Sequence, residues 1–256
     1  NQDWLELDPQ GQKLESNFYQ TEEEIFQGLI SAYSMLQPKY FSGWTSYYFL
    51  RNFPSDDAHV VGGGPGDRPE YHAIANFETK PTNTAVLQMW RRNFYGINRA
   101  NVVVANANPE ASARSAEYVA EARFLRAYYY FELVRMFGDV PLLTGILGRD
   151  EYNQSRDPAE DVFAQIIKDL QDAIGTLAKK PALGANEMYR ATDGAAKALL
   201  GKVYLYMASP YYQNEYDFEK SPDEYYGLAA EQFKQVVQST NYDLFDNYDD
   251  IWTYQG

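Results

Sequence analysis

The stretch EARFLRAYYYFELVRMFGDVPLL, Glu121 to Leu143, decides the fold of this chain of 256 residues. Residues 121–137 contain no Gly or Pro, and apolar side chains recur every three to four positions, which predicts a helix. Apolar side chains also fill most of the remaining circumference, so we expect this helix to be buried on more than one side. Gly138 favours a left-handed helix end, and Pro141 prevents the helix from resuming. The stretch therefore predicts a central buried helix, a firm stop and an extended exit.

Helical patterns also lie on both sides of this stretch. Thr21 and Glu24 form a capping box for a first helix that Pro38 ends. Asp157 reads as the N-cap of another helix, with Pro158 at its first position. Further helices are predicted from Asn83 or Thr84 to Pro109, from Thr192 to Pro210 and after Pro222. The only extended pieces that we expect are short ones near Val140–Pro141 and Val60–Val61. The sequence thus predicts an all-α fold.

The central helix has a counterpart later in the chain. Ala122, Leu125, Ala127 and Tyr130 align, in that order and at the same spacing, with Ala196, Leu199, Gly201 and Tyr204. An amphipathic helix precedes each copy, and a small residue, Ala127 or Gly201, occupies the position of close contact. This pattern is typical of tetratricopeptide-like helical repeats with expanded links.

Composition and charge exclude several classes of function. The formal net charge is −14, from 22 basic and 36 acidic side chains, which disfavours nucleic acid and anionic membrane surfaces as partners. The chain has no Cys, so disulfides, thiol nucleophiles and zinc–thiolate sites are excluded. It contains no apolar run long enough to span a membrane. No Ser-His-Asp, Cys-His or metal-His arrangement is present, so we expect a protein that is not an enzyme.

Residues 38–82 form the segment that we expect to face a ligand. The segment is long and glycine-rich, and its aromatic content argues against disorder. Sugar rings stack on aromatic side chains while polar groups fix their hydroxyls. The alternative is that several of these aromatic residues only pin the segment to the helices. The candidate ligand-binding residues are Trp44, Tyr47, Tyr48, Asp56, Asp57, Tyr71 and His72.

The same segment does not predict a metal or phosphate site. His59 and His72 fit no standard spacing of metal ligands, even with Asp56 and Asp57 nearby. The run GGGPGD lacks the Gly-Lys-Ser/Thr ending of a phosphate loop, so its glycines are expected to permit tight turns.

Two arginines interrupt the apolar central helix. We expect Arg123 and Arg126 to pair with acidic groups such as Glu121 or Asp139, or to reach the helix edge, rather than to bind an anion.

The motifs taken together resemble a known family. EARFLRAYYYFELVRMFGDVPLL resembles the most characteristic segment of the SusD/RagB family, the surface lipoproteins of Bacteroidetes-type bacteria. The resemblance covers nearly the whole chain, and the glycine-rich segment contributes least to it. Further stretches agree in order: WLELDPQGQ followed by NFYQTEEEIFQGLISAYSML, then WRRNFYGINRANVVV, ATDGAAKALLGKVYLYMA and AAEQFKQVVQSTNYDLFDNYDDIW.

The resemblance implies a tetratricopeptide-like α fold and a non-catalytic lipoprotein on the outer surface of the bacterial outer membrane. Such a protein captures oligosaccharide or polysaccharide and delivers it to a SusC-like TonB-dependent transporter. Two alternatives stay open, namely a RagB-like protein that binds peptide and a repeat scaffold that binds only protein. We expect no cofactor, and the resemblance implies that any structural calcium comes from residues beyond Gly256.

The resemblance also implies one SusD-like domain over residues 1–256. We expect an extended arm at 1–20, a first helix at 21–37, the aromatic and glycine-rich loop at 38–82, helical repeats at 83–240 and an irregular tail at 241–256. The lipid-bearing Cys of the family is absent, as expected for a chain that starts just after it. Family members are longer, so we expect part of the ligand platform to come from residues beyond Gly256.

Overall fold

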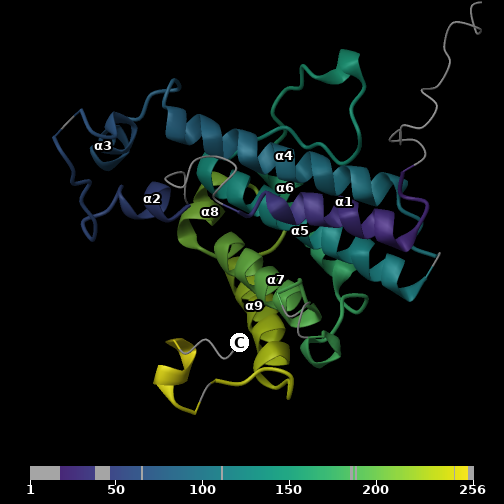
Figure 1. The fold of residues 1–256 in the computed structure, drawn as a ribbon. Coiled ribbons are helices and arrows are strands. Elements are labelled where there is room, and N and C mark those ends of the chain that lie inside the picture. Colours follow the sequence, from purple (N-terminus) through teal and green to yellow (C-terminus); the bar gives the residue numbers. More distant parts are fainter. Residues whose placement is uncertain are drawn as a thin grey trace, which may run out of the picture. The chain divides into compact units, whose positions relative to one another are not determined.

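A computed structural model describes residues 18–37, 47–64, 66–110, 112–184, 187, 189–244 and 246–252 (Figure 1). Within these ranges the regular structure is helical, and the one isolated bridge joins Val140 to Asp157. The all-α prediction is therefore confirmed, whereas the repeat remains a prediction. None of the described helices is long and apolar enough to cross a membrane.

The chain divides into two compact units. The first comprises residues 1–122 and 144–146, and the second comprises residues 123–143 and 147–256. The long helix α5 (Ala113–Phe137) starts in the first unit and continues into the second. The prediction of a single domain remains a prediction.

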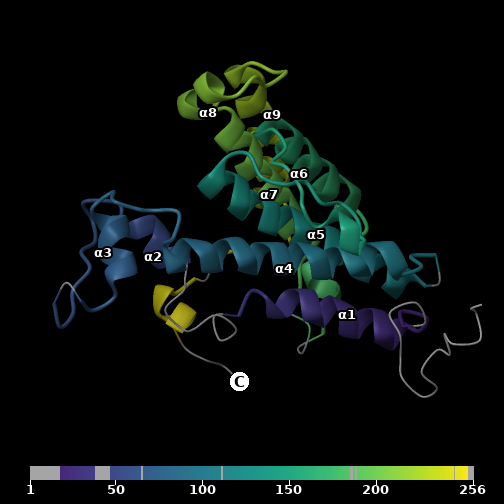
Figure 2. The same cartoon turned by 90° about the horizontal axis from the view of Figure 1, so that it is seen from above.

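The first unit is organised around α1 (Glu22–Ser34) and α4 (Thr84–Asn106), which lie side by side in Figures 1 and 2. The predicted capping box starts α1: the Glu24 backbone N–H donates to Thr21 Oγ1 at 3.3 Å, and the Glu24 carboxylate accepts from the Thr21 N–H at 3.0 Å. At the other end, the buried Arg92 of α4 donates to the carbonyl oxygens of Met35, at 2.6 Å, and Leu36. Arg92 therefore satisfies carbonyls that the helix end leaves unpaired.

The predicted loop at 38–82 contains two short helices within its described part. They are α2 (Tyr47–Asn52) and α3 (Pro69–Ala75), and both belong to the first unit. Neither is long enough to show a clear periodic pattern in the sequence. The arm predicted at 1–20 lies almost entirely outside the described residues.

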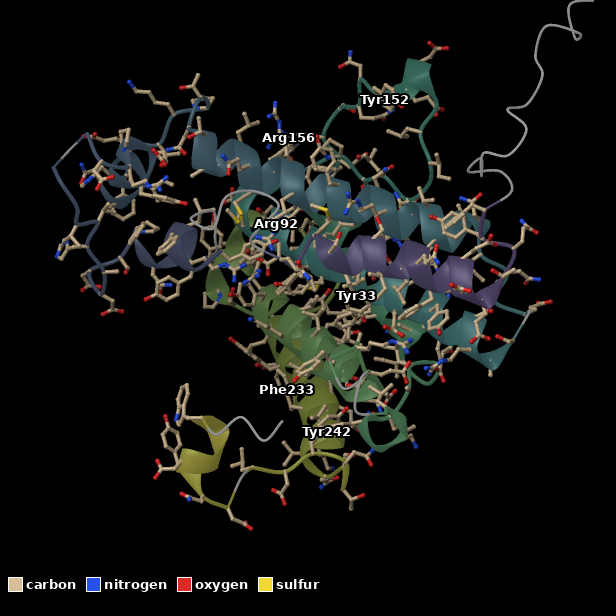
Figure 3. The ribbon with its side chains drawn as sticks, in the orientation of Figure 1. Tyr33, Arg92, Tyr152, Arg156, Phe233 and Tyr242 are labelled. Carbon is tan, nitrogen blue, oxygen red and sulfur yellow. The ribbon has the colours of Figure 1, made fainter. Side chains whose placement is uncertain are left out.

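The second unit consists of the later part of α5 and the helices that follow. Helix α7 packs on both α6 and α9. Gly201 makes the second contact possible, because a Cβ atom there would lie 2.8 Å from the ring of Phe233, labelled in Figure 3. The elements are η2 (Arg149–Glu151), α6 (Ala159–Ala173), η3 (Lys180–Ala182), α7 (Asp193–Met207), α8 (Pro210–Glu215), α9 (Pro222–Val237) and η4 (Tyr248–Trp252).

The end of α5 follows the prediction, but the start of α6 does not. Gly138 closes α5 with a φ of 64°, and Val140 leaves in an extended bridge. Asp157 is not the N-cap of α6; its carboxylate accepts from the Leu142 N–H at 2.7 Å, next to that bridge. The Asp139 carboxylate takes over the capping role and accepts from the Ala159 N–H at 2.9 Å. The cap therefore comes from a residue distant in the sequence.

Arg126 pairs with an acidic residue that the sequence analysis did not suggest. Its guanidinium donates to both carboxylate oxygens of Asp169 on α6, at 2.8 and 2.6 Å, and both side chains are buried. Glu121 accepts from the Tyr33 hydroxyl at 2.6 Å in the first unit. The expected pairing of the arginine is correct in kind, but the partner is different.

We expect Asp169→Ala to lower the free energy of unfolding by about 3–5 kcal/mol, because it removes the carboxylate that pairs with the buried, charged Arg126. Urea unfolding followed by circular dichroism measures this change. The matched control is Asp172→Ala on the same helix, which breaks the exposed pair with Lys168 and costs less than about 1 kcal/mol. Equal losses in the two variants would contradict the assigned role of the buried pair.

A second prediction concerns pH. Tyr212 is buried against Phe163 and Tyr206, and this burial raises the pKa of its hydroxyl to about 12 from 10.0. Because the folded state holds this proton more tightly, the stabilising contribution is complete below pH 10 and is lost as the pH rises towards 12. Urea unfolding at pH 8, 10 and 11 should show a decline that is smaller in Tyr212→Phe. An identical decline in this variant would contradict the prediction.

Candidate functional site

Tyr47 and Tyr48 are neighbours on α2 but lie in different environments. The Tyr47 hydroxyl donates to Asn93 Oδ1 on α4 at 2.6 Å. The guanidinium groups of Arg51 and Arg92 lie 5.1 and 5.3 Å from the centre of the Tyr47 ring, within the range of cation–π attraction. Tyr48, in contrast, is 64% exposed. Tyr47 thus anchors α2 to α4, while Tyr48 leaves its ring accessible to a ligand.

A cluster of aromatic rings supports the exposed tyrosine. Tyr71 of α3 is only 3% exposed and packs against Phe49 and Phe53, with ring centroids 5.6 and 5.5 Å apart. Phe49 and Phe53 stack at 5.2 Å, and the edge of Tyr48 contacts Phe49 at 5.6 Å. We call these four residues the aromatic cluster. It packs α2 on α3 and supports the exposed Tyr48 ring through Phe49.

Asp56 and Asp57 lie in an exposed turn directly after α2. Ser55 holds this turn, because its hydroxyl donates to the Asn52 carbonyl oxygen and accepts from the Asp57 N–H at 3.3 Å. The Asn52 side chain in turn donates to the Tyr48 carbonyl oxygen at 2.7 Å. The turn that carries both carboxylates is therefore tied to the end of α2, and both carboxylates remain accessible to solvent.

His72 lies half-buried on α3, and its Nε2 is shielded from solvent without a hydrogen-bond partner in the described part of the chain.

The Asn83 side chain ties α3 to the start of α4 by donating to the Glu70 carbonyl oxygen at 2.8 Å. Among the described residues, no group of three or more His, Cys, Asp or Glu is arranged to hold a metal ion.

The glycine run forms the tight turn that the sequence predicts. Gly64 has a φ of 129°, a conformation that residues with a side chain rarely adopt. The Asp67 carboxylate accepts from the Gly63 N–H at 3.2 Å, and the Asp67 N–H donates to the Gly64 carbonyl oxygen at 2.9 Å. The run therefore makes a compact bend before α3.

The structure brings some of the predicted site residues together. Phe49 connects Tyr48 to Tyr71, whereas no described hydrogen bond or ring contact draws Asp56, Asp57 or His72 into the aromatic cluster. Trp44 lies outside the described residues. The assignment of a ligand to these residues remains a prediction.

Sequence reasoning missed the residues that hold this segment in place. Arg92 and Asn93 share one helical face with Met89 and Ile97, and all four are buried. Two polar residues within an otherwise apolar helical face are a sequence signal for buried polar partners. The partners themselves, Tyr47 and the end of α1, could not be read from that signal.

Comparisons with known proteins identify relatives of the whole chain. Residues 3–205 match the SusD-like family, described as "Starch-binding associating with outer membrane". A SusD-like protein from Bacteroides ovatus is 26% identical over 267 residues, which cover 98% of this chain and 44% of that protein.

Solved structures agree with this match. A laminarin-binding SusD-like protein is 33% identical with a TM-score of 0.76, over 91% of this chain and 48% of that one. Surface glycan-binding protein A from Bacteroides uniformis is 25% identical with a TM-score of 0.77, over 92% and 50% of the two chains. The chain spans about half the length of these proteins.

The aromatic cluster predicts losses of stability of different size for its buried and its exposed tyrosine. Tyr71→Ala should lower the free energy of unfolding by about 3–5 kcal/mol, because it empties the centre of the cluster. Tyr48→Ala should cost less than about 1 kcal/mol, because its ring is largely exposed. Chemical unfolding of both variants measures the difference, and a larger loss for Tyr48→Ala would show that the exposed ring carries the packing.

Proposed function

The chain belongs to the SusD-like family, described as starch-binding and associated with the outer membrane, and from this we propose that it captures oligosaccharide or polysaccharide at the cell surface. It then delivers the saccharide to a SusC-like TonB-dependent transporter. The protein acts by binding alone and needs no cofactor. An N-terminal lipid, as in family members that the sequence resembles, holds it at the outer face of the outer membrane.

The exposed ring of Tyr48 carries this proposal. A sugar ring presents C–H groups that pack on the face of an aromatic side chain, and such packing is most effective when the aromatic ring is already fixed. Within the aromatic cluster, Phe49 supports the ring of Tyr48, which remains 64% exposed. A buried side chain such as Tyr71 supports this surface without touching the ligand.

Polar groups close to α2 and α3 in the sequence are proposed to orient the sugar. Asp56 and Asp57 are accessible carboxylates that accept hydrogen bonds from sugar hydroxyls. His72 Nε2 has no partner among the described residues, so a bound hydroxyl or an intervening water satisfies a group that is otherwise costly to bury. Trp44 precedes α2 by three positions and is proposed as a second stacking residue.

The similar proteins indicate which ligands to test first. The relative that is 33% identical binds laminarin, and the family description names starch. Laminarin binding is a property of that relative, and this chain spans 48% of its length. Both polysaccharides are therefore the first two probes for the full-length protein.

We expect the full-length protein to be retarded in native gels that contain laminarin or starch, and Tyr48→Ala to weaken this binding by about tenfold through the lost stacking surface. Isothermal titration calorimetry with oligosaccharides of the retarding polysaccharide gives the dissociation constants. The matched control is Tyr152→Ala, a tyrosine of similar exposure at 71% that lies in the second unit, and it should bind as the unchanged protein does.

Two results would contradict the proposal. Binding of a lysine-rich peptide but of neither glycan would assign the protein to the peptide-binding alternative. Glycan binding that is unaffected by Tyr48→Ala would retain the function but remove α2 from the site.

A further inference from the structure

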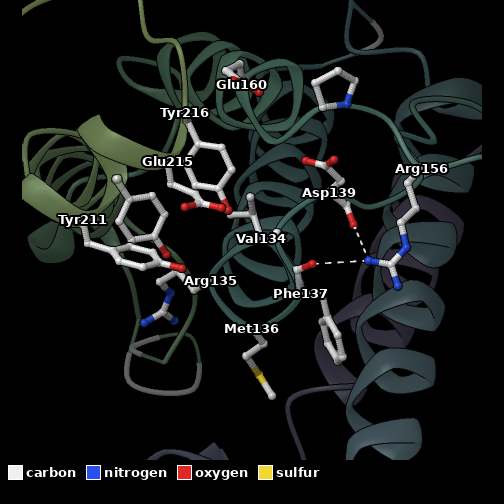
Figure 4. A pocket seen from close by; sticks show the side chains of 13 residues that line it. Val134, Arg135, Met136, Phe137, Asp139, Arg156, Glu160, Tyr211, Glu215 and Tyr216 are labelled. Carbon is white, nitrogen blue, oxygen red and sulfur yellow. Dashed lines mark hydrogen bonds between the residues drawn. The ribbon is translucent and has the colours of Figure 1, made fainter. Parts of the chain in front are cut away.

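A cleft of about 600 Å³ opens in the second unit where α5 ends and α8 begins (Figure 4). Its lining comes from the last turn of α5, the start of α6 with the segment before it, and α8. The volume falls within the range of small-molecule sites in proteins. All of the lining residues belong to the second unit, so the cleft is not part of the α2–α3 segment.

Tyrosines of α8 and of its C-cap provide the aromatic surface of the cleft. Tyr211 is 66% exposed, and its ring contacts the buried Tyr212 edge-on at 5.3 Å. Tyr216 is partly exposed and packs on Tyr212 at 5.6 Å. Tyr212 is itself held by Phe163 at 5.7 Å. The two accessible rings therefore both pack against the buried Tyr212.

Carboxylates supply hydrogen-bond acceptors around these rings. Figure 4 shows Glu215 beside Tyr211 and Tyr216, with Asp139 across the cleft. Glu215 is exposed, and within the described residues no hydrogen bond or ion pair engages its carboxylate. Asp139 accepts from the Ala159 N–H at 2.9 Å through one oxygen, which leaves its second oxygen as an acceptor.

The arginines of the cleft do not make it an anion site. Arg135 is paired with Glu132, donates to the Tyr206 hydroxyl at 3.3 Å and lies 4.2 Å from the centre of the Phe131 ring. Arg156 donates to the carbonyl oxygens of Phe137 and Asp139, at 3.3 and 2.9 Å. Both guanidinium groups thus already bind acceptors within the protein, and the nearby carboxylates repel an anion.

A cation is not strongly favoured either. The Asp139 carboxylate caps the first turn of α6, whose helix dipole places partial positive charge there. The Glu160 carboxylate likewise accepts from the Asp217 N–H at 2.9 Å. Among the three carboxylates that line the cleft, Glu215 is the one for which the described residues supply no such partner. The lining combines fixed aromatic faces with neutral and acceptor groups, which matches a polyhydroxylated, uncharged ligand.

We propose that this cleft is a second saccharide-binding site. Tyr211 and Tyr216 stack on the sugar rings, and Glu215 with the open oxygen of Asp139 accepts hydrogen bonds from the hydroxyls. Gly138 lets the Tyr216 hydroxyl lie close to the backbone, because its φ of 64° favours glycine and a Cβ atom there would lie 3.1 Å from that hydroxyl. The inference rests on the proposed saccharide binding but concerns a different surface.

The test is a titration of the full chain, labelled with ¹⁵N, with laminarihexaose and separately with maltohexaose. We expect the backbone amide signals of Gly138, Tyr211 and Glu215 to shift with one of these sugars. Tyr211→Ala should weaken binding at the cleft by about tenfold, whereas Tyr226→Ala, an exposed tyrosine of α9 outside the cleft, should leave it unchanged. Inorganic phosphate and a lysine-rich hexapeptide test the anionic and cationic alternatives.

A Tyr48→Ala background separates this inference from the proposed function. Cleft signals that still shift with sugar in this background would support a second site, even if binding at α2 is lost. Sugar-dependent shifts confined to α2 and α3 would overturn the second site while the proposed function stands. Cleft shifts caused only by phosphate or by the hexapeptide would also overturn it, as would shifts that survive Tyr211→Ala unchanged.

Discussion

The burial of α5 on several sides is the constraint on which both units depend. A helix that is surrounded by other elements cannot leave polar side chains without partners, because an unpaired buried charge is costly. In the second unit Arg126 therefore binds Asp169 with two hydrogen bonds, and in the first unit Glu121 accepts from Tyr33. The first interaction joins α5 to α6 within the second unit, and the second joins α5 to α1 within the first unit. Both therefore hold helices together as well as satisfying buried polar groups.

Aromatic residues serve two purposes in this chain. Buried rings such as Tyr71 and Tyr212 fix short helices that have too few residues to be stable alone. Two other tyrosines, Tyr48 of α2 and Tyr211 of α8, remain exposed beside these buried rings. Both proposed sites therefore lie where a short helix packs on buried aromatic rings. A surface that is supported in this way needs little ordering when it contacts a ligand.

Local signals predicted much of the fold, and particular residues show why. Thr21 with Glu24 and Gly138 with Pro141 act within one helical turn, so their effects were visible in the sequence. The short helices α2, α3 and α8 escaped prediction because fewer than three turns give no clear period. For the candidate site, sequence reasoning selected the segment around α2 and α3, but it could not separate an exposed ring from a buried one.

The sequence by itself determined the helical class, the family resemblance and the ends of the main helices, because these depend on residue types and spacing along the chain. Only the tertiary structure decided that Asp169 is the partner of Arg126 and that Asp139, rather than Asp157, caps α6. It also decided that Tyr48 is exposed while Tyr71 is buried. These outcomes depend on which segments, distant in sequence, pack against each other, and burial and pairing are properties of that packing.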